Sequence, residues 1–229
     1  MRNILLMLIV LVLAGVPAFA QDCSKFYPLQ EGTSLEYTNY DKKDRVDGTI
    51  TYEVISSENN SDGTTAVMQM SLQDQDGEEV MQSEYEVRCK DNVVHIDFKS
   101  LMNQQMMEQF KEMDVELSGT DLELPNNLAV GQSLNDANLN MKMSMGAVNM
   151  NMNVETINRK VEKKESVTTP AGTFDCFVIY SETSTKMMMG KQTFPSRTWL
   201  AEGIGVIKQE SYNKKGNPIG KMVLTAYSN

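Results

Sequence analysis

Apolar and polar residues alternate along most of the chain after residue 30. The segments at 50–54, 68–72 and 141–145 each place an apolar side chain at every second position. Because successive side chains of a β-strand point to opposite faces, this spacing predicts strands with one apolar face. Further segments of the same kind lie at 35–37, 85–89, 93–98, 148–154, 176–180, 199–201, 205–209 and 222–227.

The connections between these segments are short and rich in turn-forming residues. Gly, Pro, Asn and Asp gather at 60–63, 74–77, 170–172 and 203–205. Short turns join antiparallel neighbours, whereas parallel strands need long crossovers. We therefore expect an all-β, mainly antiparallel fold of about 10–11 strands, either one large curved meander sheet or a half-barrel.

One segment, at residues 100–113, has a helical spacing instead. Ser100 can cap a helix whose apolar side would consist of Leu101, Met102, Met106, Phe110 and Met113. An amphipathic helix in a β protein must cover apolar surface. We expect this helix to cover one face or the open end of the sheet.

The N-terminus has the pattern of a signal peptide. Arg2 precedes an apolar run at 4–15, and Ala18 and Ala20 lie where signal peptidase reads small residues. We expect residues 1–20 to be a signal peptide and 21–229 to form a single antiparallel β domain. The apolar run is shorter than the roughly 20 residues that cross a bilayer, and no later run approaches that length. The protein is thus predicted to be exported, periplasmic or secreted, and not membrane-spanning.

Three cysteines in an oxidising compartment predict one disulfide and one leftover thiol. Cys23 lies on a terminus that would otherwise fray, and Cys89 lies at the end of a predicted strand. Cys176 lies in an apolar run, where a free cysteine acts as a small hydrophobic residue. These positions favour Cys23–Cys89, and the other two pairings stay open. Asp22, directly before Cys23, argues against a lipid anchor there.

Charge and motif content exclude several functions. The formal net charge of -10 and the lack of a basic cluster disfavour nucleic acid as a partner. The single histidine, His95, lies on the polar side of a predicted strand, and no nucleophile, phosphate-loop or zinc motif is found. Residues 74–79 fit a hairpin turn better than a calcium loop. We predict a protein that is not an enzyme and has no cofactor. A pair of carboxylates can perform acid–base chemistry, but nothing in the sequence singles out such a pair.

Methionine is unusually frequent, with 16 of the 18 following residue 20. Three interpretations are open: core filling by an adaptable side chain, an apolar lining for a lipid or other hydrophobic ligand, and a copper(I) site made by Met-x-Met pairs. The copper(I) interpretation is disfavoured because the chain has only one histidine. The predicted lining set for the second interpretation is Met68, Met70, Met102, Met106, Phe110, Met141, Met143, Met145, Met150 and Met152.

Two ordered landmarks carry a family resemblance. Residues 168–177 (TTPAGTFDCF) and 198–208 (TWLAEGIGVIK), together with the opening 26–33, resemble the TapB-like proteins of Bacteroidota. These are exported chains with a domain of unknown function. The resemblance implies a large curved antiparallel sheet similar to the half-barrel of periplasmic lipoprotein carriers, and it implies no catalytic residues.

These observations favour a non-enzymatic exported envelope protein whose concave sheet binds a hydrophobic ligand or an apolar segment of a partner protein. The alternative is an accessory component of an envelope assembly with no ligand, in which the methionines only fill the core. Periplasmic copper(I) binding is a lesser alternative.

Overall fold

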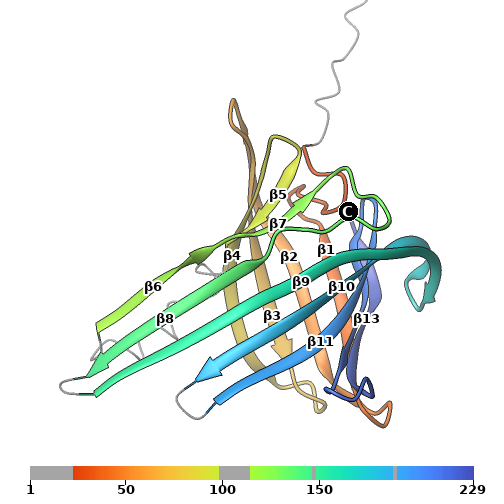
Figure 1. The fold of residues 1–229 in the computed structure, drawn as a ribbon. Helices are drawn as coiled ribbons and strands as arrows, with labels where there is room; N and C mark the ends of the chain where they lie inside the picture. The colour runs from red at the N-terminus through yellow and green to blue at the C-terminus, as the bar shows by residue number, and fades with distance from the viewer. Residues whose placement is uncertain (1–22, 98–113, 146–147, 188–189) are drawn as a thin grey trace, which may run out of the picture.

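The computed structural model describes residues 23–97, 114–145, 148–187 and 190–229, and these form one antiparallel sheet (Figure 1). The sheet has 13 strands, so the expectation of an all-β, antiparallel fold is confirmed. The strands are β1 Ser34–Asp41, β2 Val46–Asn60, β3 Gly63–Gln73, β4 Glu79–Lys90, β5 Val93–Ile96, β6 Asp114–Thr120, β7 Leu122–Pro125, β8 Ala137–Met145, β9 Val148–Thr169, β10 Gly172–Met187, β11 Gly190–Ala201, β12 Gly205–Tyr212 and β13 Pro218–Ser228.

Strands that follow one another in the chain are usually neighbours in the sheet. The order is β6-β8-β9-β10-β11-β12-β13-β1-β2-β3-β4-β5-β7, so β6 and β7 form the two edges. These two are the strands that alternation did not reveal, and the expected count was correspondingly low. β7 has only four residues and β6 contains Ser118 and Gly119, so neither displays a sustained apolar face. The predicted helix at 100–113 and the predicted signal peptide lie outside the described residues.

The sheet curls because its longest strands bend. β9 and β10 pair from Gly172 to Lys186, with register shifts between Val178 and Ile179 and between Tyr180 and Glu182. Extra residues of this kind increase local twist and bend a strand. Ribbons β8 to β11 therefore sweep across the front of Figure 1, while β1 to β4 run behind them. The result is a barrel-like sheet around an interior.

One end of the interior holds a dense apolar core. Phe26 and Val54 are fully buried there with Val94, and Phe26 packs edge-on against Phe177 at 5.9 Å between ring centroids. A second cluster joins β1 to β10–β13, with Leu224 and Ile207 fully buried. Among the described residues, no helix has the length and apolar character needed to cross a bilayer.

Candidate functional site

The upper end of the sheet in Figure 1 is closed by the segment that precedes β1. Its residues Phe26 and Leu29 enter the core, and its backbone continues the sheet where Val54 donates to the Thr33 carbonyl at 2.9 Å. Gly203 donates to the carbonyl of Lys25 at 2.9 Å, and the Lys25 ammonium lies 2.8 Å from Glu202. We call residues 23–33 the N-terminal plug.

A loop between β7 and β8, residues 126–136, closes the same end from the other side. Its Gly131 donates to the carbonyl of Val161 at 2.8 Å, and Val161 donates back to Gln132 at 2.9 Å. Leu134 adds a buried side chain to the core. Asn126 fastens this loop to the plug, because its side-chain amide donates to the Cys23 carbonyl at 2.6 Å. Two segments without regular structure thus seal one end of the sheet.

A disulfide fixes the plug covalently. Cys23 bonds to Cys89 at the end of β4, at a sequence separation of 66 and with 5.7 Å between their Cα atoms. This is the pairing that the sequence favoured. Cys176 is free and buried, and burial raises the pKa of its thiol to about 11. That thiol is accordingly protonated and unreactive at neutral pH.

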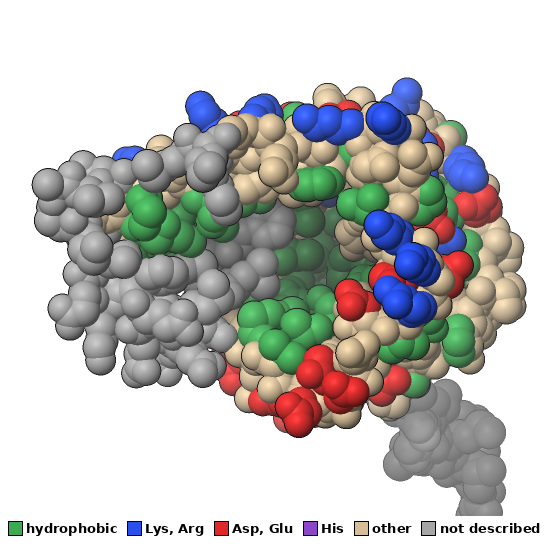
Figure 2. Space-filling view, turned by 90° about the horizontal axis from the view of Figure 1, so that it is seen from below, with side chains coloured by type: hydrophobic (Ala, Val, Ile, Leu, Met, Phe, Trp, Pro, Cys, Tyr) green, Lys and Arg blue, Asp and Glu red, His purple; other side chains and the backbone are tan. Residues whose placement is uncertain are grey.

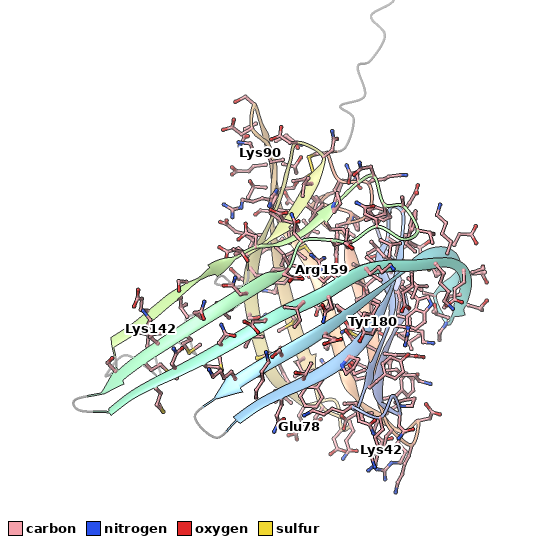
Figure 3. All side chains as sticks on the ribbon, viewed as in Figure 1. Lys42, Glu78, Lys90, Lys142, Arg159 and Tyr180 are labelled. Atoms are coloured by element: carbon pink, nitrogen blue, oxygen red, sulfur yellow. A yellow bond between two sulfur atoms is a disulfide. The ribbon has the colours of Figure 1, made fainter. Side chains whose placement is uncertain are left out.

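Among the described residues, no segment closes the opposite end of the sheet, which we call the open end. Figure 2 looks into it and shows a hollow with apolar side chains on its walls and charged side chains of both signs around its rim. The rim includes the β1–β2 turn with Lys42 and the β3–β4 turn with Glu78, whereas Lys90 lies at the closed end (Figure 3). Phe194, on the same side of β11 as the buried Ser196, remains 39% exposed.

The methionines of β8 and β9 lie on the concave face. Met141 is paired with Met152, and Met143 with Met150, so all four share one side of the sheet. Thr156 lies on that same side of β9 and lines the internal cavity described below, which identifies the side as concave. Asn151 lies between Met150 and Met152 and is exposed on the convex side.

Burial divides the predicted lining set. Met68 and Met141 are 5% and 4% exposed and behave as core residues, whereas Met70, Met143, Met150 and Met152 are only half-buried. Met102, Met106 and Phe110 lie outside the described residues, and so does the side chain of Met145. The structure therefore brings six of the ten positions onto the concave face.

An internal cavity of about 290 Å³ lies beneath the closed end. Its walls come from β5 and β7 near one edge of the sheet and from β9 to β12 on the other side, so it must lie inside the curl. The apolar wall is formed by Ile96, Leu122, Leu124, Ile179, Leu200 and Val206. The polar wall is formed by Thr156, Ser181, Thr183, Ser196, Thr198 and Gln209. Tyr27 of the plug and Arg159 complete it.

Sequence reasoning missed this cavity, and no member of the predicted lining set is among its described wall residues. Arg159 lies in the polar stretch Asn158-Arg159-Lys160, whose composition is typical of an exposed segment. The bend in β9 brings it inward: Asn158 has φ 56°, and the pairing with β10 skips from Lys160 to Ile157. Arg159 is 6% exposed. A bulge of this kind re-aims a side chain in a way that strict alternation cannot foresee.

The electrostatics of the cavity centre on Arg159. Its guanidinium donates to the Asn135 carbonyl at 2.6 Å. Burial lowers the pKa of this guanidinium, and electrostatic interactions with Tyr27 and, to a smaller extent, with Asp136 and Glu123 act against that shift. Within the described part of the chain, no carboxylate forms an ion pair with it. Burial also raises the pKa of Tyr27 to about 12, with a smaller contribution from Tyr52.

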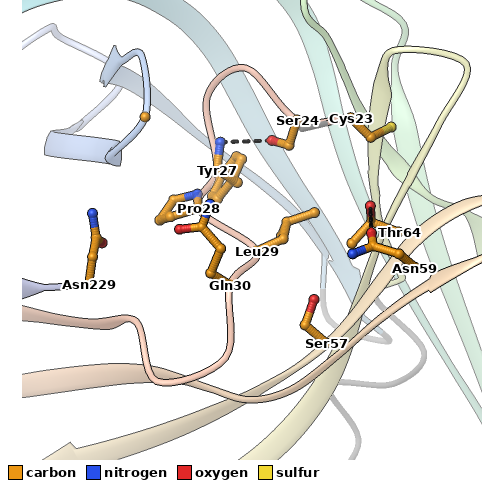
Figure 4. A pocket seen from close by; sticks show the side chains of 11 residues that line it. Cys23, Ser24, Tyr27, Pro28, Leu29, Gln30, Ser57, Asn59, Thr64 and Asn229 are labelled. Carbon is orange, nitrogen blue, oxygen red and sulfur yellow. Dashed lines mark hydrogen bonds between the residues drawn. The ribbon is translucent and has the colours of Figure 1, made fainter. Parts of the chain in front are cut away.

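Two other features do not extend the site. A cavity of about 220 Å³ lies beside the plug, bordered by Ser24, Pro28 and Asn59 (Figure 4). Its walls are largely polar. His95 lies 3.9 Å from Glu123, and in the described ranges no three His, Cys, Asp or Glu side chains converge as a metal site would require. Copper(I) coordination by methionine stays a prediction.

A family model described as DUF3108-like matches residues 30–224. The chain belongs to the DUF3108-like family. The match spans the sheet from just before β1 into β13, and the matched range contains the concave methionines and every cavity wall residue except Tyr27. It begins within the plug and does not reach Cys23. The narrower resemblance to TapB-like proteins is not confirmed by this match and stays a prediction.

Two solved structures share the fold of this DUF3108-like chain. One is from Bacteroides fragilis NCTC 9343, described as a "putative exported protein with YmcC-like fold"; it matches with a TM-score of 0.71 and 21% identity, covering 90% of this chain and 100% of that one. The other, a "putative lipoprotein" from Parabacteroides distasonis ATCC 8503, matches with a TM-score of 0.70 and 23% identity, covering 91% and 100%. No match is found among curated proteins.

Proposed function

We propose that this protein is a non-enzymatic, exported envelope protein that binds the apolar part of a ligand, or an apolar segment of a partner, inside its curled sheet. One observation carries the proposal: the plug and the 126–136 loop close the interior at one end, and at the other end the described residues form a hollow with apolar walls. Ligand sites are usually such concave, largely apolar spaces with a few polar groups.

The uneven burial of the methionines supports this function. A protein that needed methionine only for its core would bury it throughout, as it does Met68 and Met141. Met143, Met150 and Met152 instead remain half-buried on the concave face. Flexible thioether side chains can rearrange around guests of different shape. Export is supported by the descriptions of the two solved structures, which concern an exported protein and a lipoprotein.

A binding measurement tests this proposal. The protein lacking residues 1–20 is titrated with a polarity-sensitive apolar fluorophore, and we expect saturable binding. Met152→Glu places a carboxylate on the concave face, where a buried charge is costly, and should weaken binding about ten-fold or more. Asn151→Glu adds the same charge to the convex face and should leave binding unchanged.

Two outcomes of this titration would contradict the proposal. If the wild-type protein does not bind the fluorophore, or if both variants bind as tightly as wild type, the interior is not a binding site. That outcome would favour an accessory role in an envelope assembly. Circular dichroism of both variants shows whether each remains folded.

A further inference from the structure

Arg159 occupies a position that a purely structural side chain rarely has. It is 94% removed from solvent and lies on the wall of a cavity, and among the described residues its guanidinium hydrogen-bonds to a neutral backbone carbonyl, that of Asn135. A buried charge is costly unless a counter-charge and hydrogen bonds compensate it. The ion pairs of the described residues do not include Arg159, and Asp136, one of the two carboxylates that act on it at longer range, is exposed.

Three other arginines of the sheet each form an ion pair with a carboxylate. Arg197 lies on the convex side of β11 at 2.7 Å from Glu162, and Arg45 lies 2.6 Å from Asp41. Arg88 lies 3.0 Å from Asp121. All three are more exposed than Arg159 and each has a carboxylate partner. Arg159 is thus the most buried of these four arginines, and among the described residues it is the one that forms no ion pair with a carboxylate.

The remaining walls of the cavity are amphipathic in an ordered way. Leu122 and Leu124 of β7 face hydroxyl side chains of β10 and β11 across the space. The hydroxyl oxygens of Ser181 and Ser196 lie 3.0 Å apart and hydrogen-bond to each other. Both hydroxyls are uncharged. Arg159 is therefore the one full positive charge among the described wall residues.

We propose that this cavity binds the anionic oxygen headgroup of a single-chain amphiphile, with Arg159 as its counter-ion and the alkyl chain directed toward the open end. The proposal rests on the proposed function, because it names the ligand class of the same interior. A guanidinium forms strong, directional hydrogen bonds with carboxylate and phosphate oxygens. Carboxylate and phosphate headgroups share this chemistry, and the experiment separates them.

The position of Arg159 sets the orientation of the ligand. Figure 3 shows Arg159 on β9 near the closed end, beside the crossing of the 126–136 loop. Tyr27 of the plug borders the same cavity. The half-buried Met143 and Met150 lie farther along the sheet, toward the end of β8 at Met145 and the start of β9 at Val148. A headgroup at Arg159 thus leaves an apolar path for the chain along the concave face.

The test compares ligands that differ only in the headgroup. A fatty acid, an alkyl phosphate and a fatty alcohol of one chain length are each titrated into the protein lacking residues 1–20. We expect one or both anions to bind about ten-fold or more tightly than the alcohol, since charge-assisted hydrogen bonds are roughly twice as strong as neutral ones. The tighter of the two anions identifies the headgroup.

Substitutions then assign the selectivity to Arg159. Arg159→Met should abolish the preference for the anion while retaining binding of the alcohol. The matched control Arg197→Met removes a guanidinium from the convex face and should keep the preference. If Arg159→Met does not fold, Arg159→Lys keeps a charge without the planar fork, and we expect an intermediate preference.

Each outcome separates the two proposals. Equal binding of anion and alcohol by the wild type, or an unchanged preference in Arg159→Met or Arg159→Lys, would overturn the headgroup site and leave the apolar interior standing. Absence of binding by all three ligands would overturn the proposed function itself, and this inference with it.

Discussion

The two ends of the curled sheet are built from the same strands but have opposite characters. At the closed end, Phe26, Val54 and Val94 are fully buried, and a disulfide and several backbone hydrogen bonds hold the plug in place. At the open end, Met150 is half-buried and Phe194 is 39% exposed although both lie on the concave face. The strands alone therefore do not form a buried core. At the closed end, the plug and the 126–136 loop cover the concave face and bury its apolar side chains.

This difference separates stability from function in the molecule. Apolar burial contributes about 25 cal/mol per Å², so the closed end should supply most of the free energy of unfolding. Residues of the open end are then free to remain partly exposed, which a binding surface requires. Substitutions at matched positions of the two ends can test this division.

Phe26→Ala should have the largest effect. It removes a fully buried ring that packs against Phe177, and such truncations cost about 3–5 kcal/mol. Met143→Ala at the open end should cost less than about 1 kcal/mol because its side chain is only half-buried. Urea unfolding of both variants measures the difference. Similar losses would show that the two ends contribute equally.

Removal of the disulfide comes next. Cys23→Ser with Cys89→Ser frees the plug and reopens a loop whose ends have a sequence separation of 66, which should lower the free energy of unfolding by about 2–4 kcal/mol. Cys176→Ala removes the free, buried thiol and should change stability much less. Thermal unfolding of both proteins makes the comparison. An unchanged midpoint in the double variant would mean that the plug is held by packing alone.

Alkaline pH should loosen the closed end with a smaller effect. Burial raises the pKa of Tyr27 to about 12 and holds those of Tyr37 and Tyr85 well above their usual value. Because each folded pKa exceeds the unfolded value of about 10, the stability from these residues is full below pH 10. It is lost as the pH rises through about 12 for Tyr27, and through the raised pKa values of Tyr37 and Tyr85.

Tyrosinate absorbance and circular dichroism, followed together from pH 9 upward, measure this effect. We expect part of the tyrosine signal to titrate only as the fold is lost. Titration of all eight tyrosines near pH 10 with the fold intact would contradict the burial of these three hydroxyls.

The sequence predicted what depends on local periodicity. Alternation located eleven of the strands and placed the methionines of β3, β8 and β9 on one face, because the stretches that hold these methionines contain no bulge and so keep their facing. It did not reveal the buried role of Phe26, since residues 23–33 lack a periodic pattern and are buried by contacts with distant strands. Nor did it reveal Arg159, because a bulge changes facing without a marked change in composition.

Analysis of co-purified lipids measures directly whether the interior of the curled sheet binds an amphiphile. The protein is expressed with its N-terminal segment, purified from the exported fraction without detergent, and extracted for mass spectrometry in parallel with Met152→Glu. We predict near-stoichiometric amphiphile in the wild type and a strong reduction in the variant. A wild-type protein free of lipid, or equal amounts in both, would contradict a ligand-binding interior.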